Sequence, residues 1–257
     1  MGHSLACKLL QAHSSDTVQS PGQIVRCRVS RVLANDITAP LAIDSFREMG
    51  ASRVFDPERV ILVCDHFTPN KDIDSAEQVK RVREFARESG IRHYYEGGSS
   101  GVEHALLPEL GLVGPGDLVV GADSHTCTYG GLGAFATGLG STDIAAAMAL
   151  GETWFKVPPS IRVDLYGEPS RYVGGKDIVL HLIGRIGVDG ALYKALEFAG
   201  PALQMLDAEA RMTVANMAIE AGGKAGLFPA DEIALDYARA AGRQGDEPVH
   251  PDPGAEY

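Results

Sequence analysis

The chain has 257 residues, of which 45% are hydrophobic and 22% charged, and its formal net charge is −11. That length can bury the core of one large or two moderate domains, and the acidic balance argues against binding nucleic acid or an anionic membrane. No apolar run approaches the ~20 residues that a membrane-spanning helix needs, and residues 1–15 lack the basic and apolar segments of a secretory signal. We therefore expect a cytoplasmic protein.

The predicted elements alternate along the chain. Apolar runs of strand length lie at 59–65, 91–96, 117–123 and 160–168. Helical periodicity lies at 75–90, 101–111, 141–155, 175–187, 207–223 and 229–242. The first of these helices is expected to begin with a capping box made by Ser75 and Gln78 and to end at Gly90. Residues 191–200 have no clear pattern, and this alternation predicts βαβ units with a mostly parallel sheet.

Two polar clusters follow apolar strands directly. Asp65 and His66 come after the strand at 59–65, and Asp123, Ser124 and His125 come at the end of the strand at 117–123. Because ligands of open parallel sheets bind beyond the carboxyl ends of strands, these side chains are expected to line one cleft. An aspartate beside a histidine fixes the imidazole tautomer and raises its basicity, which suits acid–base chemistry. The alternative is that these residues only cap a helix or satisfy loop amides.

Other candidate residues are less specific when taken singly. His104 lies near a predicted helix start and could be structural. Asn216 and Glu220 are four residues apart and share a helix face, although Glu220 could be a solvated surface charge. Asn35 and Asp36 precede Pro40 and could form a turn or a helix start.

Glycines are concentrated after the second cluster, at positions 130, 131, 133, 138 and 140. They could suggest a phosphate-binding loop, but their spacing fits neither a P-loop nor a dinucleotide fingerprint. Close approach of the backbone to a carboxylate substrate is equally compatible with them.

The motifs in their order resemble the aconitase superfamily, and within it the isopropylmalate isomerase branch, with the homoaconitase branch second. The stretches that carry the resemblance are NDITAP, DHFTPNKDI, EGGSSGVEHALLPE, GADSHTCTYGGLGAF, GSTD, GKDIVLHLIG, GVDGALYKALEF and ANMAIEAGGKAGLFP. The resemblance implies a three-layer α/β/α fold with two related subdomains at 1–160 and 161–242. Residues 243–257, which have three prolines and no periodicity, are then expected to be a linker to a cluster-binding region.

The resemblance also implies a reaction and a role for each candidate. The enzymes are hydro-lyases that remove water from a hydroxy-di- or tricarboxylate and add it back on the adjacent carbon, here most simply converting 2-isopropylmalate to 3-isopropylmalate in leucine biosynthesis. Asp65 and His66 would protonate the departing hydroxyl, and His104 would be the partner of Asp123. The remaining roles would be substrate binding by Ser124, contact with the iron-bound hydroxyl or water by His125 and Glu220, and active-site amides at Asn35 and Asn216.

The complete enzymes of this family use two components that these residues do not supply. They hold a [4Fe–4S] cluster on cysteines that include a C-x-x-C pair, whereas Cys7, Cys27, Cys64 and Cys127 form no such motif. Their catalytic base is a serine of the small subunit or swivelling domain. We therefore expect a truncated large subunit that holds half of an active site, binds no cluster and is inactive alone. Disulfides between these cysteines are not expected in a cytosolic chain of this size.

Several alternatives stay open at this point. The substrate could be a homoaconitate or a methylmalate/citraconate-type acid. A different class of enzyme, a mononuclear metallohydrolase, could use His66, His104, Asp123 and His125 as ligands. A non-catalytic assembly module is a third possibility.

Overall fold

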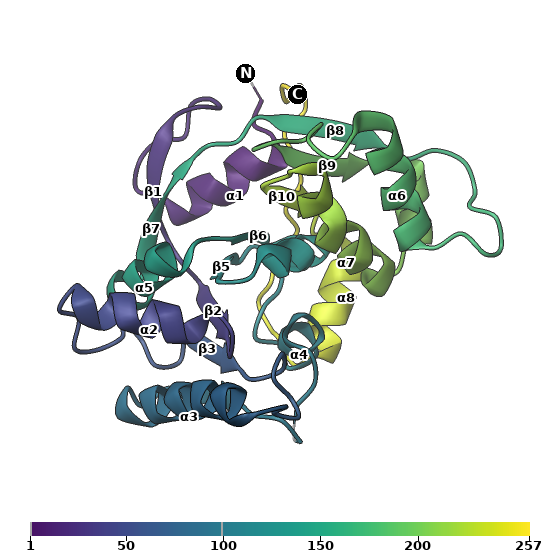
Figure 1. Ribbon diagram of the computed structural model, residues 1–257. Helices are drawn as coiled ribbons and strands as arrows, with labels where there is room; N and C mark the ends of the chain where they lie inside the picture. The colour runs from purple at the N-terminus through teal and green to yellow at the C-terminus, as the bar shows by residue number, and fades with distance from the viewer. Residues whose placement is uncertain (1, 99) are drawn as a thin grey trace.

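The computed structural model describes residues 2–98 and 100–257 (Figure 1). The α-helices are α1 (Leu5–His13), α2 (Ala39–Glu48), α3 (Ile73–Glu88), α4 (Glu103–Glu109), α5 (Ser141–Leu150), α6 (Gly175–Ile186), α7 (Ala208–Asn216) and α8 (Glu232–Ala240). The 3₁₀ helices are η1 (Ser124–Leu132), η2 (Pro201–Met205) and η3 (Met217–Ala221). The strands are β1 (Ile24–Arg28), β2 (Arg31–Asn35), β3 (Val60–Val63), β4 (His93–Tyr95), β5 (Leu118–Gly121), β6 (Phe135–Gly138), β7 (Glu152–Lys156), β8 (Ser160–Asp164), β9 (Ala195–Ala199) and β10 (Ala225–Leu227). Within the described ranges, no helix is long and apolar enough to cross a membrane.

The larger sheet positions the polar clusters. Its strand order is β4-β3-β2-β5-β6, and every neighbouring pair runs parallel. Successive side chains of a strand face opposite sides, so Leu62 and Val120 enter the core shared with α2, α3 and α5. Ile61 and Val119 enter the core shared with α4 and η1 on the other side. The sheet is therefore a buried middle layer, and all its carboxyl ends open at one edge.

The smaller sheet carries the C-terminal part of the fold. Its strands are parallel in the order β10-β9-β8, and its core includes side chains of α6 and α7. A separate antiparallel ribbon pairs β1 with β7. The α/β fold with mostly parallel sheets is therefore as predicted, whereas the division into units at residue 160 stays a prediction.

A buried carboxylate connects the first helix to the smaller sheet. Glu197 of β9 is 3% exposed and accepts hydrogen bonds from the backbone N–H groups of Leu5 and Ala6, at 2.9 and 3.0 Å. The Ser160 hydroxyl donates to the same carboxylate at 2.6 Å. A negative charge at a helix N-terminus satisfies amides that have no partner within the helix, which fixes α1 between the two sheets.

Two predicted helices differ from the observed ones in an instructive way. Helix α3 begins two residues before the predicted start, and its capping box is formed by Asp72 and Ser75, so Ser75 is not the N-cap. The predicted helix 141–155 ends at Leu150, because Gly151 adopts a left-handed conformation with φ of 72°. The following residues form β7, whose partner β1 is more than a hundred positions earlier in the chain.

Other elements were not predicted. Helices α1 and α2 and strands β1, β2 and β6 had no assignment, and residues 191–200 contain β9. The predicted helix 207–223 is α7 continued by η3, which ends at Ala221. The described residues 243–257 contain no helix, and Asp252 ties them to the N-terminal segment through an ion pair of 2.9 Å with Lys8.

Candidate active site

The two polar clusters meet at the carboxyl edge of the larger sheet. Strand β2 lies between β3 and β5, so the residues that follow these strands are brought together although they are about 60 positions apart in sequence. The Nε2 atom of His66, after β3, lies 3.7 Å from Oδ2 of Asp123, after β5. Asn35 ends β2 between them, with its side-chain amide 3.4 Å from the same oxygen.

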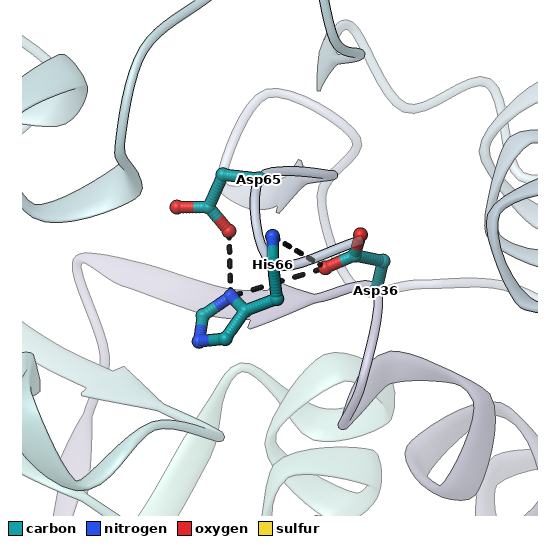
Figure 2. A group of neighbouring side chains, drawn as sticks. All are labelled: Asp36, Asp65 and His66. Carbon is teal, nitrogen blue, oxygen red and sulfur yellow. Dashed lines mark hydrogen bonds and ion pairs between the residues drawn. The ribbon is translucent and has the colours of Figure 1, made fainter. Parts of the chain in front are cut away.

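The carboxylates of Asp65 and Asp36 face the Nδ1 side of the His66 ring (Figure 2). Its Nδ1 atom lies 2.7 Å from Oδ1 of Asp65, and its backbone N–H donates to Asp36 at 3.1 Å. Asp36 is fully buried and also accepts the Phe67 N–H at 2.8 Å, so it fixes the loop that carries the ring. Because Nδ1 donates to Asp65, Nε2 is left without a strong partner on a side chain that is 35% exposed.

The start of helix α4 fixes the other oxygen of Asp65. The backbone N–H of Glu103, the first residue of α4, donates to Asp65 Oδ2 at 2.7 Å. Asp65 therefore accepts one hydrogen bond from the imidazole and one from a helix N-terminus. A carboxylate held in this way stabilises the protonated form of the neighbouring ring.

His104 and Asp123 form a second imidazole–carboxylate pair. His104 Nε2 lies 3.1 Å from Asp123 Oδ1, and His104 Nδ1 lies 3.1 Å from the hydroxyl of the buried Tyr129. The hydrogen bond from His104 is the largest cause that lowers the pKa of Asp123 to about 2, with a smaller contribution from the His125 N–H and opposition from burial. Asp123 is therefore an anion at all working pH values. Asp123 is also the N-cap of η1, so the capping role given above as the alternative is observed as well.

The third imidazole of the edge is more exposed. His125 Nε2 lies 3.1 Å from Glu220 of η3, and its Nδ1 lies 3.2 Å from the Ser124 hydroxyl. His125 and Glu220, each expected to contact the same hydroxyl or water, are therefore brought together although they are 95 residues apart in sequence. Their side chains are 37% and 52% exposed, which leaves both able to meet a ligand.

Asn216 has different neighbours from the rest of the predicted site. Its side-chain amide donates to the hydroxyl of Thr128 at 2.8 Å, and its backbone carbonyl accepts from Cys127 Sγ at 3.2 Å. The Thr128 hydroxyl in turn donates to the His125 carbonyl at 2.6 Å. Asn216 thus supports the turn that carries His125 through Thr128, and among the described residues its side chain makes no hydrogen bond to an imidazole ring.

Three residues of this edge were not among the predicted site residues: Glu103, Asp36 and Tyr129. Asp36 had been interpreted as a turn residue. The only signal for Glu103 was a charged residue beside His104 in an otherwise apolar first turn, and such a residue is ordinarily solvated. Tyr129 had no signal, because a tyrosine within a glycine-rich stretch gives no indication of its partner.

Packing accounts for the glycines at 130, 131 and 133, whereas Gly138 and Gly140 line a cavity beside Ser124, where contact with a ligand stays a prediction. A Cβ at Gly130 would lie 1.9 Å from the Gly226 carbonyl oxygen, and one at Gly131 would lie 2.5 Å from the Met212 nitrogen. These contacts press η1 against α7 and β10, at a separation that only glycine allows. Gly133 in addition has a φ of 82°, at the left-handed end of η1.

The side chains that lie close enough together to hold a metal ion are not the set that a mononuclear metallohydrolase would need. Within the described ranges, the sets with ligand atoms within 4.8 Å of one another are Asp36–Asp65–His66 and His66–Glu103–Asp123. Each contains one imidazole, and neither contains His104 or His125, which that alternative requires. These groups are also already paired with one another, so the arrangement does not favour a mononuclear metal site.

The cysteines do not fit an iron–sulfur cluster. All four are buried free thiols. Burial is the largest cause that raises the pKa of Cys64 and Cys127 to about 12 and that of Cys27 to about 11. Cluster ligands are thiolates, which these environments disfavour, so no step of the chemistry is assigned to a cluster held by this chain.

The sequence profile of the aconitase family (aconitate hydratase) matches residues 7–252. The chain therefore belongs to the aconitase family, in agreement with its parallel α/β fold and with the acid–base groups at the sheet edge.

Among the similar proteins, the 3-isopropylmalate dehydratase large subunit of Nitratidesulfovibrio vulgaris (strain Miyazaki F) is 70% identical over 257 residues, which are 100% of this chain and 61% of that protein. The subunit of the same name from Oleidesulfovibrio alaskensis is 71% identical with the same coverage. One from Pyrococcus abyssi is 59% identical over 93% of this chain and 56% of its own length. The chain thus spans about three fifths of the length of these relatives.

Proposed function

We propose that residues 1–257 belong to the large subunit of a hydro-lyase that converts 2-isopropylmalate to 3-isopropylmalate by dehydration and rehydration. The observation that carries this proposal is the placement of two imidazole–carboxylate pairs at one sheet edge, His66 with Asp65 and His104 with Asp123. The names of the relatives at about 70% identity support the choice of substrate.

His66 is the group best arranged to protonate the departing hydroxyl. Hydroxide is a poor leaving group, so a positioned acid lowers the barrier to its departure. Asp65 holds the proton on Nδ1 and stabilises the imidazolium, which leaves the proton on Nε2 for the substrate. When water adds back to the adjacent carbon, the same ring takes a proton from it as hydroxide bonds to that carbon, which returns the ring to its protonated form.

The other polar groups of the edge would bind the substrate and the hydroxyl or water that leaves and returns. His125 and Glu220 would contact that hydroxyl or water. The Ser124 hydroxyl, 3.2 Å from His125 Nδ1, would donate to a substrate carboxylate. We propose that the base that removes the α-proton is a serine of a small-subunit partner. The cofactor, a [4Fe–4S] cluster, would be held by cysteines outside residues 1–257.

The test of this function is an activity screen of the complete large subunit. The protein would be reconstituted with iron and sulfide, mixed with its small subunit, and given isopropylmalate, homocitrate with homoaconitate, or citraconate. Turnover of isopropylmalate at a kcat/KM at least about tenfold above the other acids supports the proposal. Preference for homoaconitate or citraconate would replace the substrate, and turnover of none would support a non-catalytic assembly role.

A separate prediction concerns iron in residues 1–257 alone. After anaerobic reconstitution and desalting, we expect substoichiometric iron and no cluster absorbance, because two of the thiols have a pKa of about 12 and none belongs to a ligand motif. Iron analysis and visible absorbance provide the measurement. Four irons per chain with a cluster spectrum would show that the ligands lie within these residues.

A further inference from the structure

Glu103 is a deeply buried acid of the candidate active site. Its side chain is 1% exposed, and its Oε1 atom accepts a hydrogen bond of 3.0 Å from the side-chain amide of Asn35. Its other oxygen, Oε2, is buried and has no hydrogen-bond partner among the described residues. No other buried side-chain polar atom of the described chain is without a partner.

The Asn35 amide has a fixed orientation. Its Oδ1 atom accepts hydrogen bonds from the backbone N–H groups of Ile37 and Thr38, both at 3.1 Å, and from the Thr38 hydroxyl at 2.9 Å. The amide nitrogen must therefore face the carboxyl groups, where it donates to Glu103 and, at 3.4 Å, to Asp123. Asn35 consequently bridges Glu103 to the carboxylate that holds His104.

The groups that face Glu103 come from the ends of β2, β3 and β5 and from α4 and η1. They are Asp36, Asp65, His66, His104, Asp123 and Tyr129. Three of them are carboxyl groups, so an ionised Glu103 would add a fourth negative charge in a site with little solvent. An anionic oxygen without a donor is far more costly to bury than a neutral hydroxyl without an acceptor.

We propose that Glu103 is a positioning residue that works as a neutral acid: it accepts the hydrogen bond of the Asn35 amide without adding a charge, so that the negative charge stays on Asp65 and Asp123. Asn35 would then hold Asp123, and Asp123 would hold His104. This inference rests on the proposed function for its kinetic consequence, although not for the state of the carboxyl group itself. In agreement with it, burial above all, and then the charges of Asp65, Asp123 and Asp36, raise the pKa of Glu103 to about 8 against the hydrogen bond from Asn35.

The kinetic test compares Glu103→Gln with Glu103→Ala in the complete, reconstituted enzyme. Glutamine keeps an acceptor for Asn35 and cannot ionise, whereas alanine removes the acceptor. We expect kcat of the glutamine variant to exceed that of the alanine variant by about tenfold, the value of one hydrogen bond. All variants share whatever alkaline loss of kcat the general acid imposes, but wild type should show an additional loss above about pH 8 as Glu103 ionises, and the glutamine variant should lack this additional loss. Equal damage in both variants, or an unchanged alkaline limb, would overturn the proposal.

A second test does not depend on activity, so it separates this inference from a failure of the proposed function. Between about pH 4.5 and about pH 8, an acid with this raised pKa keeps its proton in the folded state, whereas the unfolded chain has released it. The free energy of unfolding therefore falls as pH rises through this range. The melting temperature of Glu103→Gln minus that of wild type should therefore increase as pH rises across this range. Glu109→Gln, at the exposed end of the same helix, is the matched control and should show a constant difference. A constant difference for Glu103→Gln as well would contradict the neutral-acid assignment.

Discussion

Replacing His66 with alanine in the complete enzyme is expected to lower kcat by about 10³–10⁴-fold, at the upper end of the range for general acid catalysis. The expected size follows from the poor leaving group and from the geometry, because Asp65 holds Nδ1 of His66 at 2.7 Å and Nε2 keeps no partner closer than 3.7 Å among the described residues. KM should change little, since Ser124 and the other substrate contacts remain. Steady-state kinetics with saturating isopropylmalate provide the measurement.

A matched control for this variant is His181→Ala. His181 lies on the exposed surface of α6, which packs against the smaller sheet and contributes no residue to the candidate active site. Its replacement should leave kcat within about twofold of wild type, as expected of a surface substitution. If His66→Ala retained half of the wild-type kcat, the acid would have to be another group.

The largest expected effect on stability is at Arg211. This residue of α7 is fully buried, and its guanidinium donates to both oxygens of Asp231, at 2.6 and 2.9 Å, and to the carbonyls of Leu203 and Leu206. Burial disfavours the ionised form of Asp231, but the hydrogen bonds and charge of Arg211 outweigh it and lower the pKa of Asp231. Because Asp231 also N-caps α8, this pair connects three elements.

Asp231→Ala should therefore destabilise the fold by about 3–5 kcal/mol, because it leaves a buried guanidinium without its counter-charge. Denaturant or thermal unfolding of the chain, followed by circular dichroism, provides the measurement. Arg239→Ala is the control, since Arg239 forms only exposed ion pairs on α8 and should leave the midpoint nearly unchanged. Equal shifts in the two variants would show that the buried pair contributes no more than a surface one.

The sequence was informative where function depends on a strand end. The apolar runs before Asp65 and Asp123 placed both residues at the carboxyl edge of a parallel sheet, and β2 between them accounts for their approach. The pairing of His104 with Asp123 was implied by the family resemblance, and the structure places the two side chains 3.1 Å apart. The resemblance gave His125 and Glu220 a shared contact to the hydroxyl or water and no contact with each other, and they lie 3.1 Å apart. Their catalytic roles stay predictions.

What the sequence did not reveal depends on tertiary contact. The strand β7 was assigned to a helix because its pairing with β1 is set by residues more than a hundred positions away. The sequence left a ligand-binding role open for the glycines at 130 and 131, because the segments that they pack against, at Gly226 and Met212, are distant in the chain. Glu103 was missed for the same reason, since its burial depends on three strand ends that converge on it.

The most direct test of the central claim is a crystal structure of the complete large subunit with a bound hydroxycarboxylate. We predict that the leaving hydroxyl lies within about 3.2 Å of His66 Nε2, with His125 and Glu220 on the same oxygen. The opposite edge of the larger sheet offers a different cavity of about 420 Å³, lined by residues that include His13, Arg31 and Arg59. A substrate bound in that cavity, with the His66 edge empty, would contradict the assignment of the active site.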